Sequence, residues 1–195
     1  MRKVELTLGL AAILLTASAC NKNDSAANKS GQTPAATKAA GSQTIASGLP
    51  QDSKFMVAAK AAGIDKTLAG PGPYTVLVPD DAAFAKLPAG TLDNSSDPNK
   101  RAKITSILTY HILPGTVLAA DIGKTIDNAK GKAVMMTVGG QTFTATKEGG
   151  NLVLTDSAGN KAHITKADDQ FSNGVVHHID TVMAPPEPKT EASGK

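Results

Sequence analysis

Four histidines are the side chains best suited to catalysis or metal binding in this sequence: His111, His163, His177 and His178. Together with an aspartate they would hold a metal ion only if three or four ligands converged on one point. His177 and His178 are adjacent in a segment with strand character, so their side chains should point to opposite faces of a sheet. The spacing therefore predicts no metal site and no cofactor. A periplasmic metal-dependent hydrolase that uses His178 or His163 stays as an alternative hypothesis.

Each histidine also has a structural interpretation. We expect His177 to be buried and hydrogen-bonded to the backbone or to a threonine. We expect His111 to hydrogen-bond locally, beside a packed Tyr110. Such partners are usual, because buried polar groups almost always form hydrogen bonds. His178 is expected on a more exposed face, where it is the best candidate for pH-sensitive behaviour at the surface.

Other motifs for catalysis or ion binding are incomplete. Residues 93–97 read Asp-Asn-Ser-Ser-Asp, which alternates oxygen ligands, but Pro98 takes the place of the turn glycine and no glutamate completes a calcium site. We interpret this segment as a loop with a helix cap. The chain has no Gly-x-Ser-x-Gly nucleophile motif. Gly-Pro-Gly-Pro at 70–73 lacks the Lys-Ser/Thr pair of a phosphate-binding loop. These observations predict that the chain is not an enzyme.

The single cysteine, Cys20, points to a lipid anchor. Arg2 and Lys3 precede a mostly apolar run over 6–19, which has the length of a signal-peptide core and is too short to span a bilayer. Its last residues, Ala-Ser-Ala, stand directly before Cys20, and this pattern resembles a bacterial lipoprotein cleavage site. A lone thiol otherwise has no evident use in an oxidising compartment. We therefore predict a lipid-anchored protein of the cell envelope, at the outer membrane and periplasm or at the cell surface; ordinary secretion is the alternative.

Composition divides the chain into four parts. Residues 1–19 form the predicted signal peptide, and residues 20–43 are small and polar, which predicts a lipidated cysteine followed by a flexible tether. Residues 44–184 form the predicted domain, and 185–195 a disordered tail. Within 44–184, basic and acidic residues are equal in number. The domain therefore lacks the basic surplus that is typical of a nucleic-acid-binding protein. Separately, we expect the domain to be monomeric.

Helical patterns come first in the domain and strand patterns follow. The sequence predicts helices over 55–62, 82–87 and 98–111, with Asp80 and Asp97 as caps. A β-branched and aromatic segment bounded by prolines predicts a strand over 74–78. From Ala133 the apolar period changes to two, with hairpin turns at the glycine pairs 139–140 and 149–150 and a last strand over 175–183. Helices followed by strands indicate the α+β class.

Three segments resemble the signature boxes of the fasciclin-like domain family. They read GPYTVLVPDDAAFAKLP at 72–88, LTYHILPG at 108–115 and NGVVHHIDTVMAP at 173–185. The resemblance implies a β-wedge of two packed sheets with a helical N-terminal half, in which strands 74–78 and 175–179 are central and adjacent. It also implies structural or binding roles for the motif residues Thr75, Pro79, Phe84, Tyr110, His111, Asn173, Gly174, His177 and Asp180.

The same resemblance implies an adhesion function. We expect a non-enzymatic interaction module that binds an envelope or extracellular protein or polysaccharide, reaches the membrane through its lipid anchor, and does not bind nucleic acid. A small-ligand carrier is the alternative, and it would require a large apolar cavity between the sheets.

Overall fold

A computed structural model describes residues 41–87 and 97–186 of the chain. The described residues belong to one compact unit. The predicted signal peptide, Cys20, most of the predicted tether, the segment 93–96 and most of the predicted tail lie outside the described residues.

Six helices lie in the described residues, and local sequence signals explain most of their ends. Ser53 caps the second helix, since its hydroxyl accepts a hydrogen bond from the Met56 N–H, and Gly63 ends it with a left-handed φ of 75°. Asp97 caps the fifth helix and Pro98 occupies its first turn, as predicted. The helices are α1 (Ile45–Gly48), α2 (Lys54–Ala62), α3 (Asp65–Ala69), α4 (Asp81–Phe84), α5 (Pro98–Tyr110) and α6 (Ala119–Asn128).

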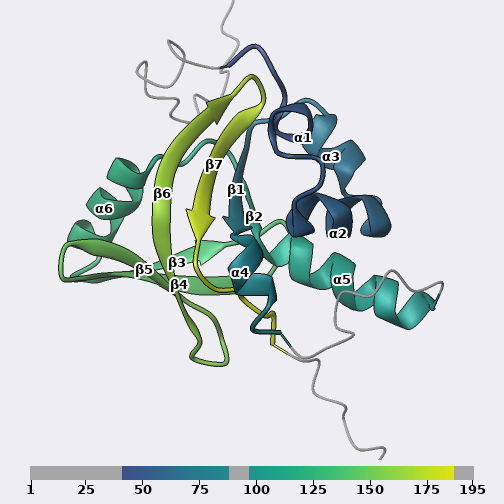
Figure 1. Cartoon of the computed structure of the whole chain (residues 1–195). Coiled ribbons are helices and arrows are strands. Elements are labelled where there is room, and N and C mark those ends of the chain that lie inside the picture. Colours follow the sequence, from purple (N-terminus) through teal and green to yellow (C-terminus); the bar gives the residue numbers. More distant parts are fainter. Residues whose placement is uncertain (1–40, 88–96, 187–195) are drawn as a thin grey trace, which may run out of the picture. The chain divides into compact units, whose positions relative to one another are not determined.

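Seven strands of the described part form one hydrogen-bonded series in the order β2-β1-β7-β6-β5-β4-β3. Figure 1 shows β1, β7 and β6 side by side, with α1, α2, α3 and α5 on one side of the strands and α6 on the other. The strands are β1 (Tyr74–Pro79), β2 (Ile112–Pro114), β3 (Lys132–Met136), β4 (Thr142–Glu148), β5 (Asn151–Thr155), β6 (Lys161–Phe171) and β7 (Gly174–Ile179).

The two strands that the sequence placed at the centre are neighbours. β1 and β7 pair in parallel over their whole length, from Tyr74 opposite Gly174 to Pro79 opposite Ile179. All other strand pairs of the series are antiparallel. The prediction that 74–78 and 175–179 meet inside the sheet is therefore confirmed.

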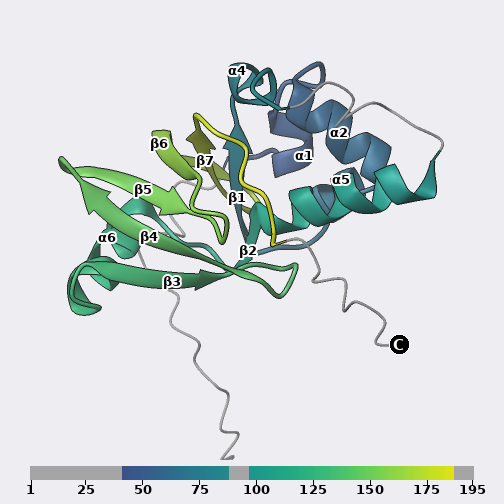
Figure 2. The same cartoon turned by 90° about the horizontal axis from the view of Figure 1, so that it is seen from below.

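The two ends of the strand series also approach each other. The N–H of Val138, just after β3, donates to the carbonyl oxygen of Ile112 in β2 at 2.7 Å. Figure 2 shows β3 and β2 meeting in this way, so that the sheet curls towards a barrel. The α+β class is confirmed, but the packing of two separate sheets is not, because the strands form one continuous series.

The core occupies both faces of the central strands. Val76 and Val78 join a cluster with the buried faces of α1 to α5, whereas Leu77 joins a second cluster under α6 and β3 to β6. Alternation along a strand sends successive side chains to opposite faces. A fully buried Val or Leu contributes roughly 1.5–3 kcal/mol, so β1 stabilises both clusters.

Two local expectations need correction. The turn between β3 and β4 is wider than a glycine pair, since Thr137 pairs with Gln141 and the loop includes Val138, whose N–H is directed to β2. Helix α6 was not predicted, although its two large buried residues, Ile122 and Ile126, are four positions apart and so lie on one face of a helix. By contrast, Gly149 and Gly150 form the predicted two-residue turn between β4 and β5.

Candidate functional site

The side chain of Asn173 joins three segments that are far apart in the sequence. Its Oδ1 accepts a hydrogen bond from the Ile45 N–H at 2.8 Å, at the start of α1. Its Nδ2 donates to the carbonyl oxygens of Leu68 and Gly70, each at 2.8 Å, at the end of α3. All its polar atoms are thus used inside the fold.

Thr75 and His177 fasten the loop between β2 and α6 to the central strands. The Thr75 hydroxyl donates to the Gly115 carbonyl and accepts from the Val117 N–H, both at 2.8 Å. His177 is fully buried, and its Nε2 lies 2.9 Å from the Val117 carbonyl oxygen, while its Nδ1 accepts from the Asp168 N–H at 3.1 Å. Burial lowers the pKa of His177, which keeps the ring neutral. The expectation of a buried, hydrogen-bonded His177 is confirmed.

Tyr110 and His111 connect α5 to the rest of the core. The Tyr110 hydroxyl donates to the Thr142 carbonyl at 2.9 Å. His111 Nδ1 lies 2.8 Å from the Ile107 carbonyl oxygen, and its Nε2 accepts from the Met183 N–H at 3.1 Å. Burial lowers the pKa of His111 to about 4, so the ring is neutral with its proton on Nδ1. Both residues pack and bond as predicted, and neither is exposed.

The other motif residues also serve the fold: Phe84, Pro79 and Gly174 by packing, and Asp180 by hydrogen bonds to His163 nearer the surface. Phe84 packs in the first core cluster and Pro79 is buried at the end of β1. A Cβ at Gly174 would overlap the Tyr74 carbonyl oxygen, so the close pairing of β1 and β7 requires glycine there. The Asp180 carboxylate accepts from the N–H of His163 at 2.8 Å and lies 2.9 Å from its Nδ1.

The histidines do not converge. His111 and His177 bond to backbone groups at different places, His163 pairs with Asp180, and His178 lies beside other carboxylates. Within the part of the chain that the structure describes, no group of three or more histidine, cysteine or acidic side chains is arranged to hold a metal ion.

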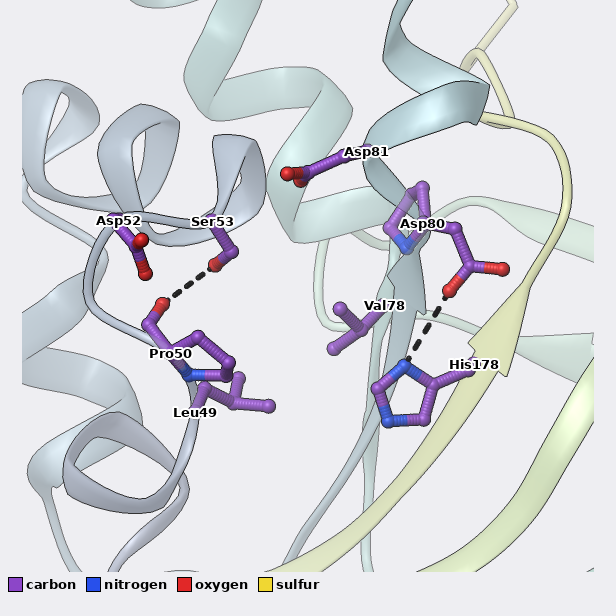
Figure 3. Close-up of a pocket in the computed structure, with 9 residues that line it drawn as sticks. Leu49, Pro50, Asp52, Ser53, Val78, Asp80, Asp81 and His178 are labelled. Atoms are coloured by element: carbon purple, nitrogen blue, oxygen red, sulfur yellow. Dashed lines mark hydrogen bonds and ion pairs between the residues drawn. The ribbon is translucent and has the colours of Figure 1, made fainter.

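His178 lines an open cleft of about 230 Å³, which we call the His178 cleft. Figure 3 shows its two walls: one comes from the connection between α1 and α2, and the other from the end of β1, the start of α4 and β7. Apolar and acidic side chains share the lining, which consists of Leu49, Pro50, Asp52, Ser53, Val78, Pro79, Asp80, Asp81 and His178.

Carboxylates flank the His178 ring on both sides. Its Nδ1 is 3.7 Å from Asp80 Oδ1 and its Nε2 is 3.2 Å from Asp169 Oδ2. Burial alone would raise the pKa of Asp169, but the hydrogen bond and charge of Lys166, together with His178, outweigh burial and lower it. Asp80 stands at the N-cap position of α4, yet its side chain does not cap the helix as predicted. Instead it accepts from the Thr165 hydroxyl at 3.3 Å.

Comparison with known proteins identifies the family of this architecture. The family model for the Fasciclin domain matches residues 50–185. The chain belongs to the fasciclin domain family. The resemblance of the three sequence segments is therefore confirmed.

Several relatives of this fasciclin chain are known. Protein sll1483 of Synechocystis sp. is 35% identical over 142 residues, covering 73% of this chain and 72% of that protein. Cell surface glycolipoprotein MPB83 of Mycobacterium bovis is 33% identical over 115 residues, covering 59% of this chain and 45% of that protein. Among solved structures, a FAS1 domain pair from the insect cell adhesion molecule Fasciclin I matches with a TM-score of 0.48 and 27% identity, covering 69% of this chain and 45% of that one.

The fasciclin domain also exposes features that sequence reasoning did not assign. Val134 and Met136 on β3 are 66% and 63% exposed, so these two apolar side chains are directed away from the core, whereas Ala133 of the same strand is buried. The grouping of Asp52, Asp80 and Asp81 in the His178 cleft was also not predicted, although Asp80 directly precedes α4 and Asp52 lies just before the Ser53 cap of α2. None of the helices in the described ranges has both the length and the hydrophobicity to cross a bilayer.

Proposed function

We propose that this chain is a non-enzymatic interaction module of the cell envelope. In this proposal Cys20 carries lipid, and the fasciclin domain binds protein or polysaccharide partners and so supports adhesion. Membership of the fasciclin family supports it. So does the name of a relative: MPB83 is a cell surface glycolipoprotein.

One structural observation carries the proposal. The polar motif side chains are used for hydrogen bonds within the fold: Asn173, Thr75, His177, His111 and Tyr110 each bond to backbone groups from other segments. A catalytic group must be able to reach a substrate, and these groups are buried and already paired. Their role is to hold a rigid scaffold, whose surface then recognises partners.

A small-ligand carrier and a metal-dependent hydrolase are the alternatives. The His178 cleft, at about 230 Å³, is smaller than the roughly 300–1,000 Å³ of usual small-molecule pockets. A hydrolase would need metal ligands that converge, and the histidines of the described residues bond to separate partners. The observations therefore favour the interaction module.

Chemical crosslinking in intact cell envelopes tests this function. The lipidated chain is crosslinked to its neighbours, purified and compared with a Cys20→Ala form and with an unrelated lipoprotein. We expect specific envelope proteins or polysaccharides to be enriched with the lipidated chain. If its enrichment matched that of the unrelated lipoprotein, the proposed function would be wrong.

A further inference from the structure

The His178 cleft combines an acidic rim with apolar walls. Asp52, Asp80 and Asp81 supply three carboxylates, and the cleft residues include no lysine or arginine. Among the ion pairs of the described residues, none joins a lysine or arginine to any of these three aspartates. The cleft therefore gathers three carboxylates, of which Asp80 has His178 as a neighbour and none is paired with a lysine or arginine of the described residues.

The apolar walls define what kind of cation fits. Leu49 and Pro50 on one side, and Val78 and Pro79 on the other, offer contact to a hydrocarbon chain. Lysine and arginine combine such an apolar stem with a charged head. A bare metal ion would gain nothing from these walls, and the described residues include no metal-binding group of three ligands.

The size of the cleft also favours a single side chain as its occupant. Its volume is below the usual range for a small-molecule pocket and suits a single long side chain. His178 forms part of the wall, and its contacts to Asp80 and Asp169 hold the ring in place. Asp81 is positioned by the Lys54 N–H, which donates to its Oδ1 at 2.9 Å.

We propose that the His178 cleft receives a lysine or arginine side chain of a protein partner. This inference rests on the proposed function, because it assigns a partner chemistry and a contact point to the interaction module. A single exposed charge pair contributes little, so the contact is weak by itself. Several copies in one membrane would strengthen it by avidity.

Nuclear magnetic resonance titration tests the proposal. The full chain, prepared without lipid through Cys20→Ala, is titrated with three blocked pentapeptides that carry lysine, arginine or norleucine at the centre of Ser-Gly-x-Gly-Ser. Norleucine keeps the apolar stem of lysine and lacks its charge. We expect saturable shifts of the Ser53, Asp81 and His178 amides with lysine or arginine, and none with norleucine.

A double variant, Asp52→Asn with Asp81→Asn, should weaken binding of the lysine peptide about fivefold. Asparagine keeps an oxygen that can accept from the Lys54 N–H. A control is Asp127→Asn on α6, which removes an exposed carboxylate that pairs with Lys147 outside the cleft lining and should leave the titration unchanged. Equal shifts with norleucine, no saturation with any peptide, or unchanged binding by the double variant would overturn the proposal.

The envelope crosslinking experiment separates this inference from the proposed function. If the double variant captures the same partners as the wild-type chain, the cleft assignment is wrong and the interaction module stands. If neither form captures a partner, the proposed function fails, and the peptide titration still decides whether the cleft binds basic side chains.

Discussion

The Asn173 side chain and the Ile45 N–H are joined by a hydrogen bond of 2.8 Å, although 128 positions separate them in the sequence. The same amide also bonds to two carbonyl oxygens at the end of α3. One side chain therefore fixes the start of α1, the end of α3 and the entry to β7 relative to one another.

Replacing this amide should destabilise the domain strongly. Asn173→Ala leaves one buried N–H and two carbonyl oxygens without their partner, and we expect a loss of about 3 kcal/mol in the free energy of unfolding. Asn173→Asp keeps the acceptor for Ile45 but places a carboxylate against two carbonyl oxygens, so it should not restore stability. Urea unfolding measures both. Asn128→Ala on the exposed end of α6 is the control and should change stability by less than about 0.5 kcal/mol. Equal losses of unfolding free energy for Asn173→Ala and Asn128→Ala would contradict the stabilising role of the Asn173 hydrogen bonds.

Acid should destabilise the domain through His111. The pKa of His111 is about 4 in the folded chain, against about 6.5 when it is unfolded, because burial disfavours the charged ring. A lowered histidine pKa gives stability that is fully present above pH 6.5 and is lost as the pH falls towards 4. The loss from this group is about 3 kcal/mol by pH 4. The pKa of His177 is lowered in the same direction and adds to it.

The carbon shift of the His111 ring, followed by NMR between pH 8 and pH 4.5, checks this directly. We expect it to stay near the neutral value down to about pH 5 while the fold is intact, and to change only as the pH approaches 4. Titration of His111 near pH 6.5 in the folded protein would show that the ring is not held neutral by burial. Urea unfolding at several pH values gives the matching loss of stability.

Sequence reasoning succeeded where the signal was local. An apolar run between two prolines was enough to predict β1, and the glycine pair at 149–150 marked the turn between β4 and β5. It failed where the deciding partner is distant. At the start of helix α6, the Ala119 N–H donates a hydrogen bond to the Asp168 carboxylate of β6 at 2.9 Å. The residue that caps this helix is therefore distant in the sequence, and no neighbouring residue indicates where the helix begins.

The same reason explains the missed cleft. Asp80 occupies a capping position by sequence, yet in the fold its carboxylate turns to Thr165 and His178, which come from β6 and β7. A local pattern cannot reveal that choice, because the competing partners are 85 or more positions away. His178 was singled out as a surface candidate, and it does lie on the more exposed face, but its acidic neighbours became visible only in three dimensions.

Gly174→Ala should disrupt the pairing of β1 and β7. The new Cβ would overlap the Tyr74 carbonyl oxygen, which is backbone and cannot move without breaking the register. We expect a loss of about 3 kcal/mol or more, or failure to fold. Gly149→Ala is the matched control: it has open space around it and a positive φ of 58°, so only backbone strain of about 1 kcal/mol is expected. Thermal unfolding of the two variants should therefore differ clearly, and similar melting temperatures would contradict the steric argument.

Lipid modification of Cys20 is the remaining prediction, and it decides how the domain meets its partners. The small residues before the single cysteine predict cleavage that leaves Cys20 as the first residue of the mature chain. A single acyl chain holds proteins on membranes only marginally, so stable anchoring requires more than one. Mass spectrometry of the mature amino terminus from native cells should find Cys20 with several acyl chains, and Cys20→Ala should release the protein from washed membranes. An unmodified terminus at another residue would instead support ordinary secretion, and the adhesion proposed here would then have to act from solution.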